Sequence, residues 1–215
     1  GVKIASEKIN KLKAKQMPIS IEEIQSFKEN LPFKLTNAQE RTIKEISEDI
    51  SLAKPMRRLV QGDVGSGKTV VAAMSMYISA KNNSQSVLLC PTEVLAEQHF
   101  KNFSAWFKNL NIKIELLTGK MPVSKRRGIY QDLENGEIDI LIGTHAVFQE
   151  KVKMKNLGLV VVDEQQRFGV KQRFDLVKKS SDQIMPHQLF MTATPIPRTL
   201  AMTIFADLEL SLIHI

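Results

Sequence analysis

The stretch that most restricts the fold is GDVGSGKT at residues 62–69, between the short apolar run RRLVQ and the long segment VVAAMSMYISA. It matches the pattern G-x-x-x-x-G-K-[ST], and its context predicts a strand that turns through glycines into a helix. Gly62, Gly65 and Gly67 let the backbone curl so that its N–H groups converge before the helix N-terminus. Such a turn binds phosphate oxygens.

The side chains of this loop have expected places at a nucleotide. Lys68 would reach the β and γ phosphates and Thr69 would ligate magnesium, so ATP and Mg²⁺ are the expected cofactors. A chance glycine turn before a helix is the alternative. The predicted nucleotide-binding residues here are Gly62, Asp63, Val64, Gly65, Ser66, Gly67, Lys68 and Thr69.

Beyond LPFKLT, short runs rich in Val, Ile and Leu alternate with helical stretches such as residues 93–108. Runs of this kind suit strands buried on both faces, and the alternation indicates a parallel sheet. The predicted fold class is therefore α/β, with helices flanking a mainly parallel sheet in three layers. The predicted strands lie at residues 57–61, 86–90, 112–117, 138–143, 157–162 and 187–192.

Residues 1–30 read as a Lys-rich helical lead-in from Ile4 to about Asn30, and residues 31–215 as the main domain. Ser20 and Glu23 have capping-box spacing. The lysines of the lead-in either form a solvated face or touch a phosphate backbone.

The chain has 215 residues, a net charge of +7 and 43% hydrophobic residues, which is typical of a soluble globular domain with one core. The charge favours a polyanionic partner, although many soluble proteins are as basic. The single Cys90 excludes an internal disulfide and fits a reducing, cytosolic setting. No apolar run approaches the roughly 18 residues of a membrane helix, so no membrane partner is expected.

Polar residues follow three of the predicted strands, where ligands of parallel sheets bind. Asp163 and Glu164 could divide the work, with Asp163 orienting hydrated magnesium and Glu164 activating water, or could merely complement a helix dipole. The turn Thr192–Ala193–Thr194 either senses the γ phosphate or simply joins a strand to a helix. Thr92, Thr144 and His145 are either cap residues or contacts to a nucleic-acid backbone.

Gln39 lies three residues after Thr36, in the spacing of a capping box. It could therefore stabilise a helix N-terminus. The other interpretation is that Gln39 contacts adenine.

Several longer motifs occur in family order between about Leu31 and Ile213. They are LPFKLTNAQ, RRLVQGDVGSGKTVVAA, PTEVLAEQHF, LLTG, IGTHAVFQ, VVVDEQQRFGVKQR and MTATPIPRTLA. With these motifs, the chain resembles the first motor lobe of the RecG family of superfamily-two helicases, bacterial ATP-dependent DNA translocases. The resemblance implies a RecA-like fold and a DEAH-type box.

The resemblance also implies roles for single residues. Gln39 would read adenine, Asp163 and Glu164 would be the acidic pair, and the turn of residues 192–194 would couple hydrolysis to lobe movement. Gln166 stands where the family usually has His; it keeps hydrogen bonding but carries no charge, which puts pH-sensitive coupling there in question. The DNA-contact candidates are Thr92, Gly119, Thr144, His145 and Arg198.

As partners, the resemblance implies branched double-stranded DNA (stalled forks and Holliday junctions), an upstream wedge domain and a second lobe with arginine fingers. Both ends of the chain read as cut, so we expect these residues to bind nucleotide and hydrolyse it poorly, because an arginine finger contributes about a thousandfold or more. A monomer in the bacterial cytoplasm, associated with the nucleoid, is expected.

Three other classes of protein share part of this pattern. The motor of the transcription-repair coupling factor is similar, but it generally has Glu where this chain has Gln165, and its region before the first helix differs from LPFKLTNAQ. A nucleotide sensor would not need Glu164. An RNA helicase would need residues that read a 2′-hydroxyl, and the sequence shows none.

Overall fold

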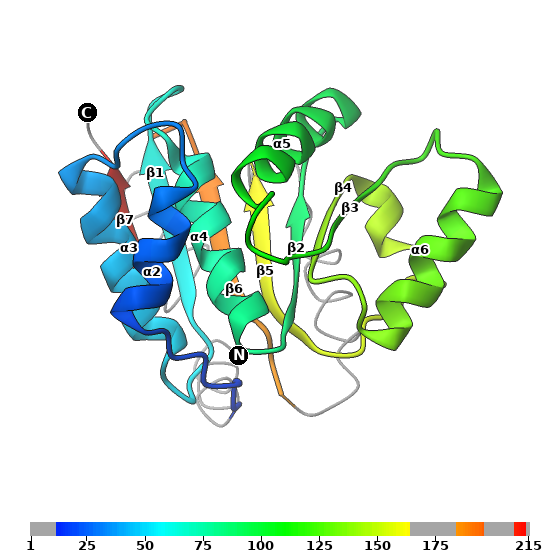
Figure 1. Cartoon of the computed structure of the whole chain (residues 1–215), viewed down its shortest axis with the longest axis horizontal. Helices are drawn as coiled ribbons and strands as arrows, with labels where there is room; N and C mark the ends of the chain where they lie inside the picture. The colour runs from blue at the N-terminus through cyan, green and yellow to red at the C-terminus, as the bar shows by residue number, and fades with distance from the viewer. Residues whose placement is uncertain (1–11, 164–183, 196–208, 214–215) are drawn as a thin grey trace, which may run out of the picture.

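The computed structural model describes residues 12–163, 184–195 and 209–213, and within them the strands form one seven-stranded sheet (Figure 1). The strand order is β3-β4-β2-β5-β6-β1-β7, and every pair is parallel. The predicted α/β class and mainly parallel sheet are therefore confirmed. The strands are β1 (Arg57–Gly62), β2 (Gln85–Leu89), β3 (Ile114–Leu117), β4 (Ile140–Gly143), β5 (Leu157–Asp163), β6 (His187–Thr192) and β7 (Glu209–Ile213).

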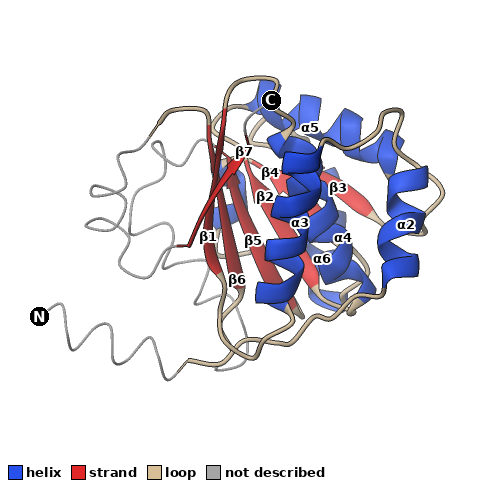
Figure 2. Ribbon diagram, turned by 90° about the vertical axis from the view of Figure 1, so that its left-hand side faces the viewer, coloured by secondary structure: helices blue, strands red, loops and turns tan. Residues whose placement is uncertain are grey.

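Helices connect the strands from β1 to β5, and α2, α3, α4 and α5 lie along one face of the sheet in Figure 2. None of the helices in the described residues is long and apolar enough to cross a bilayer. The predicted helix at residues 93–108 is confirmed as α5. The helices are α2 (Ile21–Glu29), α3 (Asn37–Ile50), α4 (Lys68–Lys81), α5 (Glu93–Trp106), α6 (Val123–Asn135) and the 3-10 helix η1 (His145–Phe148).

The strands β2, β4, β5 and β6 are buried along their whole length, as their continuous apolar runs predicted. In β5, Leu159 and Val161 enter the core cluster that contains α4, whereas Val160 and Val162 enter a second cluster with Ile129 of α6. Successive strand residues point to opposite faces, so a strand covered on both sides has no polar alternation.

The edge strand β7 was not predicted. It pairs in parallel with β1, from Arg58 opposite Glu209 to Gly62 opposite Ile213. At five residues, ELSLI is short, and its alternation of polar and apolar residues gives little signal without its neighbour.

The predicted helical lead-in is wrong for residues 12–20, which are extended; residues 1–11 lie outside the described part. The amide of Ala14 donates to the Ala53 carbonyl at 2.7 Å, and that of Met17 donates to the Ile50 carbonyl at 2.8 Å. Pro18 disfavours helical geometry at Met17, whose side chain is fully buried in the core. Tertiary contacts therefore replace the helical hydrogen bonds.

Both predicted capping boxes are present. The Ser20 hydroxyl accepts from the Glu23 amide and the Glu23 carboxylate accepts from the Ser20 amide. Thr36 and Gln39 do the same at α3. The helix that follows Ser20 packs Phe27 against Tyr77 of α4, with ring centroids 5.3 Å apart, so α2 shares the main core.

Candidate functional site

The loop between β1 and α4 has the backbone that its glycines predicted. Gly65 and Gly67 have φ angles of +83° and +80°, in the left-handed region that other residues rarely adopt. Gly67 is the N-cap of α4 and makes no side-chain cap, so the first amides of the helix have no side-chain acceptor there. This is the arrangement that binds anions at a helix N-terminus.

Lys68 folds back over this loop. Its ammonium donates to the carbonyl oxygens of Gly62 at 2.6 Å and Asp63 at 3.0 Å. The Ser66 side chain is 1% exposed, and its hydroxyl has no hydrogen-bond partner among the described residues. Thr69 is partly buried, whereas Asp63 and Val64 are exposed. A buried polar atom without a partner is uncommon in a native protein and fits a loop built around a ligand.

Gln39 connects α3 to the loop. Its Oε1 accepts from the Thr36 amide at 2.9 Å, and its Nε2 donates to the Ser66 carbonyl at 3.1 Å. A Cβ on Gly67 would lie 1.9 Å from that Nε2. The capping interpretation is confirmed, and the bond to Ser66 adds a direct support of the loop. Contact with adenine stays a prediction.

Asp163 ends β5 and is 8% exposed. Its Oδ2 lies 2.8 Å from Nε2 of His99, a buried residue of α5 that the sequence patterns did not single out. Burial raises the pKa of the neighbouring Cys90 thiol, with a smaller contribution from the charge of Asp163, and this keeps the thiol protonated. Asp163 therefore lies at the carboxyl end of β5 with a histidine partner, and its role at magnesium stays a prediction.

Thr192 ends β6 and is fully buried, and its hydroxyl accepts from the Thr194 amide at 3.1 Å. Ala193 is partly buried and Thr194 is exposed. Because β5, β6 and β1 are neighbours, the turn after β6 lies between Asp163 and the glycine loop along the carboxyl edge of the sheet. Three of the predicted sites thus share one edge.

The DNA-contact candidates gather farther along the same edge, after β2, β4 and β3. A Cβ on Gly119 would lie 3.6 Å from Oε1 of Glu93 and 3.9 Å from Nε2 of His145. Thr92 precedes Glu93, is exposed and caps α5 by accepting from the Leu95 amide. The cluster therefore contains the predicted residues Thr92, Gly119 and His145.

Two features of this cluster were not foreseen. The Thr144 side chain is 2% exposed, and its hydroxyl lacks a partner among the described residues, so it does not face solvent here. Glu93 carries a negative charge among the candidates and pairs with Lys120 at 3.1 Å, and the Lys120 hydrogen bond lowers the pKa of Glu93. Phosphate contact by these residues stays a prediction.

Three predicted residues, Glu164, Gln166 and Arg198, lie outside the described residues. Their predicted roles therefore stay predictions.

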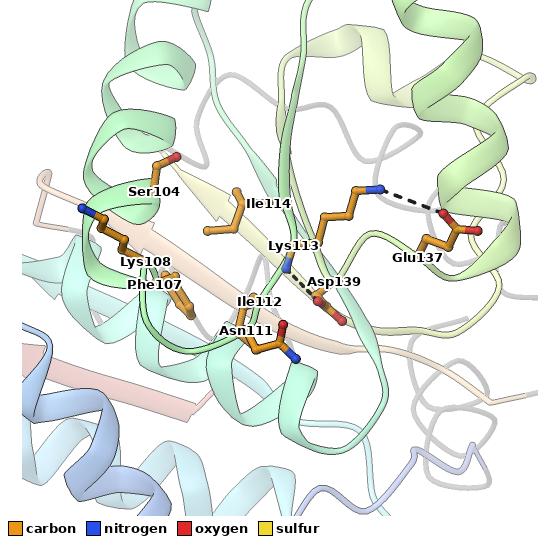
Figure 3. A pocket seen from close by; sticks show the side chains of 9 residues that line it. All are labelled: Ser104, Phe107, Lys108, Asn111, Ile112, Lys113, Ile114, Glu137 and Asp139. Atoms are coloured by element: carbon orange, nitrogen blue, oxygen red, sulfur yellow. Dashed lines mark hydrogen bonds and ion pairs between the residues drawn. The ribbon is translucent and has the colours of Figure 1, made fainter.

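A separate hollow of about 600 Å³ opens where β3 and β4 begin, at the opposite end of the strands from the glycine loop (Figure 3). The Asp139 carboxylate accepts from the Lys113 amide at 2.8 Å, while partial burial raises the pKa of Asp139. Lys113 also lies 4.0 Å from Glu137. Lys113 and Glu137 are thus paired across the hollow, which lies apart from the candidate site.

Comparison with known proteins assigns the family. The sequence profile of the DEAD/DEAH box helicase family matches residues 36–203. The chain therefore belongs to that family, and its sheet with the glycine loop at the carboxyl edge is the RecA-like fold of helicases.

Within the family, the chain is similar to RecG helicases. It is 48% identical over 210 residues to the ATP-dependent DNA helicase RecG of Aquifex aeolicus, covering 98% of this chain and 26% of the relative. It is 52% identical over 184 residues to RecG of Escherichia coli K12, covering 85% of this chain and 27% of the relative. The chain thus spans about a quarter of these relatives.

Solved structures agree with this assignment. The structure of RecG bound to a three-way DNA junction superposes with a TM-score of 0.83 at 39% identity, covering 100% of this chain and 28% of that one. A DNA-bound DUF1998 helicase, MrfA, matches at 17% identity with a TM-score of 0.69, which shows a shared fold.

Proposed function

We propose that this chain is the ATP-binding motor lobe of a RecG-type DNA translocase that couples ATP hydrolysis to movement on double-stranded DNA and to remodelling of forks and Holliday junctions. The observation that carries the proposal is the common edge of β5, β6 and β1. There, Asp163, the Thr192 turn and the glycine loop follow three neighbouring strands. A hydrolysis site needs all three, and a simple phosphate site needs only the loop.

The residues present fit a Mg²⁺–ATP complex. The amides of the loop would hold the phosphate chain, and the buried Ser66 hydroxyl, which has no partner among the described residues, would gain one. Thr69 and Asp163 would hold the metal, Asp163 through water. When bound, Mg²⁺ would neutralise charge on the phosphate oxygens. Glu164 would orient the attacking water and accept its proton.

Lys68 would change partners when nucleotide binds. Its ammonium now donates to the Gly62 and Asp63 carbonyls. A phosphate is a stronger acceptor for an ammonium than a neutral carbonyl, because the hydrogen bond is charge-assisted. The lysine therefore holds the loop in shape until the phosphates replace these carbonyls.

The relatives of this chain and its net positive charge both support DNA as its partner. A RecG relative binds a three-way DNA junction, and the net charge of +7 here suits a polyanion. Thr92, Gly119 and His145 would line the DNA side, with Thr144 and Arg198 as further candidates. We infer that a wedge domain, a second RecA-like lobe and the Gln166 and Thr192–Thr194 coupling elements complete a monomeric motor in the bacterial cytoplasm, associated with the nucleoid.

Calorimetry with ADP and Mg²⁺ tests the nucleotide site. We expect Lys68→Ala to weaken binding beyond detection, and Lys81→Ala, at the far end of the same helix, to leave affinity unchanged. Equal affinities for the wild type and Lys68→Ala would contradict the site. In the full-length protein, Glu164→Gln is expected to retain ATP binding and lose DNA-stimulated turnover; wild-type turnover would contradict the water-activating role.

A further inference from the structure

The contact between α5 and the end of β5 assigns a role to a residue outside the sequence predictions. His99 is 7% exposed, and its Nε2 lies 2.8 Å from Oδ2 of Asp163. An ionised carboxylate has no hydrogen to donate and can only accept hydrogen bonds. Nε2 of His99 therefore carries the hydrogen and donates it to Asp163. The two residues are 64 positions apart in the sequence, so only the fold brings them together.

The second ring nitrogen of His99, Nδ1, sets this histidine apart from His187. Nδ1 of His99 is buried and has no partner among the described residues. By contrast, His187 uses both nitrogens: Nδ1 accepts from the Met56 amide at 2.9 Å, and Nε2 lies 2.8 Å from the Lys15 carbonyl. A buried polar atom without a partner costs about 1–3 kcal/mol. An apolar residue at position 99 could not bond to Asp163, so this contact, and not packing alone, accounts for a histidine there.

The surroundings of Asp163 show why its carboxylate needs the hydrogen bond from His99. The carboxylate is buried beside Cys90, whose thiol stays protonated, and a charged group in such a place needs a hydrogen-bond partner. A bond to Oδ2 also fixes the rotation of the carboxylate and hence the direction of Oδ1. Residues that hold metal-binding carboxylates in this way change metal affinity about 10–100-fold when they are replaced.

We propose that His99 is a positioning residue that holds the Asp163 carboxylate in the orientation required for the hydrated Mg²⁺ of the nucleotide site. The inference rests on the proposed function, because it concerns the metal of that site. It predicts that His99 acts on the metal-dependent part of nucleotide affinity and leaves the metal-free part unchanged.

Two isosteres of histidine separate positioning from packing. The amide nitrogen of Gln can occupy the place of Nε2, whereas that of Asn corresponds to Nδ1 and does not reach Asp163. His99→Gln therefore retains the donor, and His99→Asn is a polar, uncharged variant that loses it. Gln98→Ala, at the exposed neighbouring position on α5, is the control for the helix.

The experiment measures ADP affinity in the full-length protein by calorimetry, with Mg²⁺ and with EDTA. The ratio of the two affinities is expected to fall about tenfold in His99→Asn and to stay near the wild-type ratio in His99→Gln and Gln98→Ala. Affinity in EDTA is expected to change less than twofold. An unchanged ratio in His99→Asn, equal losses in Asn and Gln, or an equal loss in EDTA would each overturn the proposal.

A second measurement needs no variant and covers the case in which His99→Asn does not fold. In the ¹⁵N spectrum of histidine-labelled wild-type protein, His99 is expected as the Nε2–H tautomer, and its signals are expected to shift when Mg²⁺ is added to the ADP complex. No shift on adding Mg²⁺ would overturn the proposal. If the wild type shows no Mg²⁺-dependent binding of ADP, the proposed function itself fails; binding with an unaffected His99 overturns only this inference.

Discussion

Gln39 reaches from the first turn of α3 to the glycine loop, where its Nε2 donates to the Ser66 carbonyl at 3.1 Å while its Oε1 accepts from the Thr36 amide at 2.9 Å. One amide side chain therefore holds a helix N-terminus and the phosphate loop together. We therefore expect nucleotide binding to be coupled to the position of α3 through this residue.

Replacing Gln39 with Ala is expected to lower the free energy of unfolding by about 1 kcal/mol for each hydrogen bond lost, and to weaken ADP binding several-fold. Glu23→Ala removes the corresponding capping residue of α2, away from the loop, and is expected to lower stability without changing ADP affinity. Chemical denaturation and calorimetry measure the two quantities. If both variants leave ADP affinity unchanged, Gln39 serves only as a cap.

Gly67→Ala is expected to abolish ADP binding and to lower the free energy of unfolding by about 1–3 kcal/mol. The residue has a φ of +80°, and its Cβ would lie 1.9 Å from Gln39 Nε2. Gly128 of α6 is the control, because a Cβ there meets no atom within 4 Å. Gly128→Ala is expected to raise stability by about 0.5–1 kcal/mol with ADP affinity intact. Binding by Gly67→Ala at wild-type affinity would show that the loop does not need this geometry.

The stability of the protein is expected to fall as the pH drops below about 6.5 because of His187. Burial lowers the pKa of this histidine from its ordinary value of 6.5, although the bond to Lys15 and the charge of Asp49 act in the opposite direction. The neutral ring is thus favoured in the folded state. Its contribution is complete above pH 6.5 and is lost as the pH falls toward the lowered pKa, by at most about 1.4 kcal/mol per pH unit.

Urea unfolding at pH 7.5 and 5.5 tests this dependence. His187→Gln cannot titrate, so the stability difference between the wild type and the variant is expected to shrink at the lower pH. A difference that grows on acidification would mean that the sign is wrong and that the ring is charged in the folded protein.

Arg58 is expected to be the most sensitive ion-pairing residue among those described. Its side chain is 8% exposed, and it contacts Asp49 at 2.7 Å and Glu45 at 3.2 Å. It also donates to the Ser211 hydroxyl of β7 at 2.6 Å. The carboxylates of Asp49 and Glu45 stay partly exposed, at 27% and 37%, and solvent screens the charges left behind. Arg58→Met is therefore expected to cost about 2 kcal/mol, mainly through the lost charged hydrogen bonds.

Arg41 provides the comparison for Arg58. It lies 3.9 Å from the same Glu45, but its side chain is 60% exposed. Arg41→Met is expected to cost less than about 0.5 kcal/mol in denaturant unfolding, since solvent screens exposed pairs. Similar costs for the two variants would show that burial does not determine the strength of the network.

Local patterns in the sequence were sufficient for much of the fold. The strands β1 to β6, helix α5 and both capping boxes were predicted, because periodicity and capping depend on residues a few positions apart. The glycine loop was predicted for the same reason. The acidic residue at the end of β5 and the threonine turn at the end of β6 followed from the rule that ligands bind at the carboxyl ends of parallel strands.

Relations between distant residues were decided only by the tertiary structure. Residues 12–20 looked helical by their own pattern but are extended, because Met17 is buried and its amide bonds to Ile50. β7 is a strand because β1 offers it an unpaired edge. His99 meets Asp163 because the order of the strands places α5 beside the end of β5. Sequence spacing determines what each segment can form, whereas the crossovers between strands determine which side chains meet.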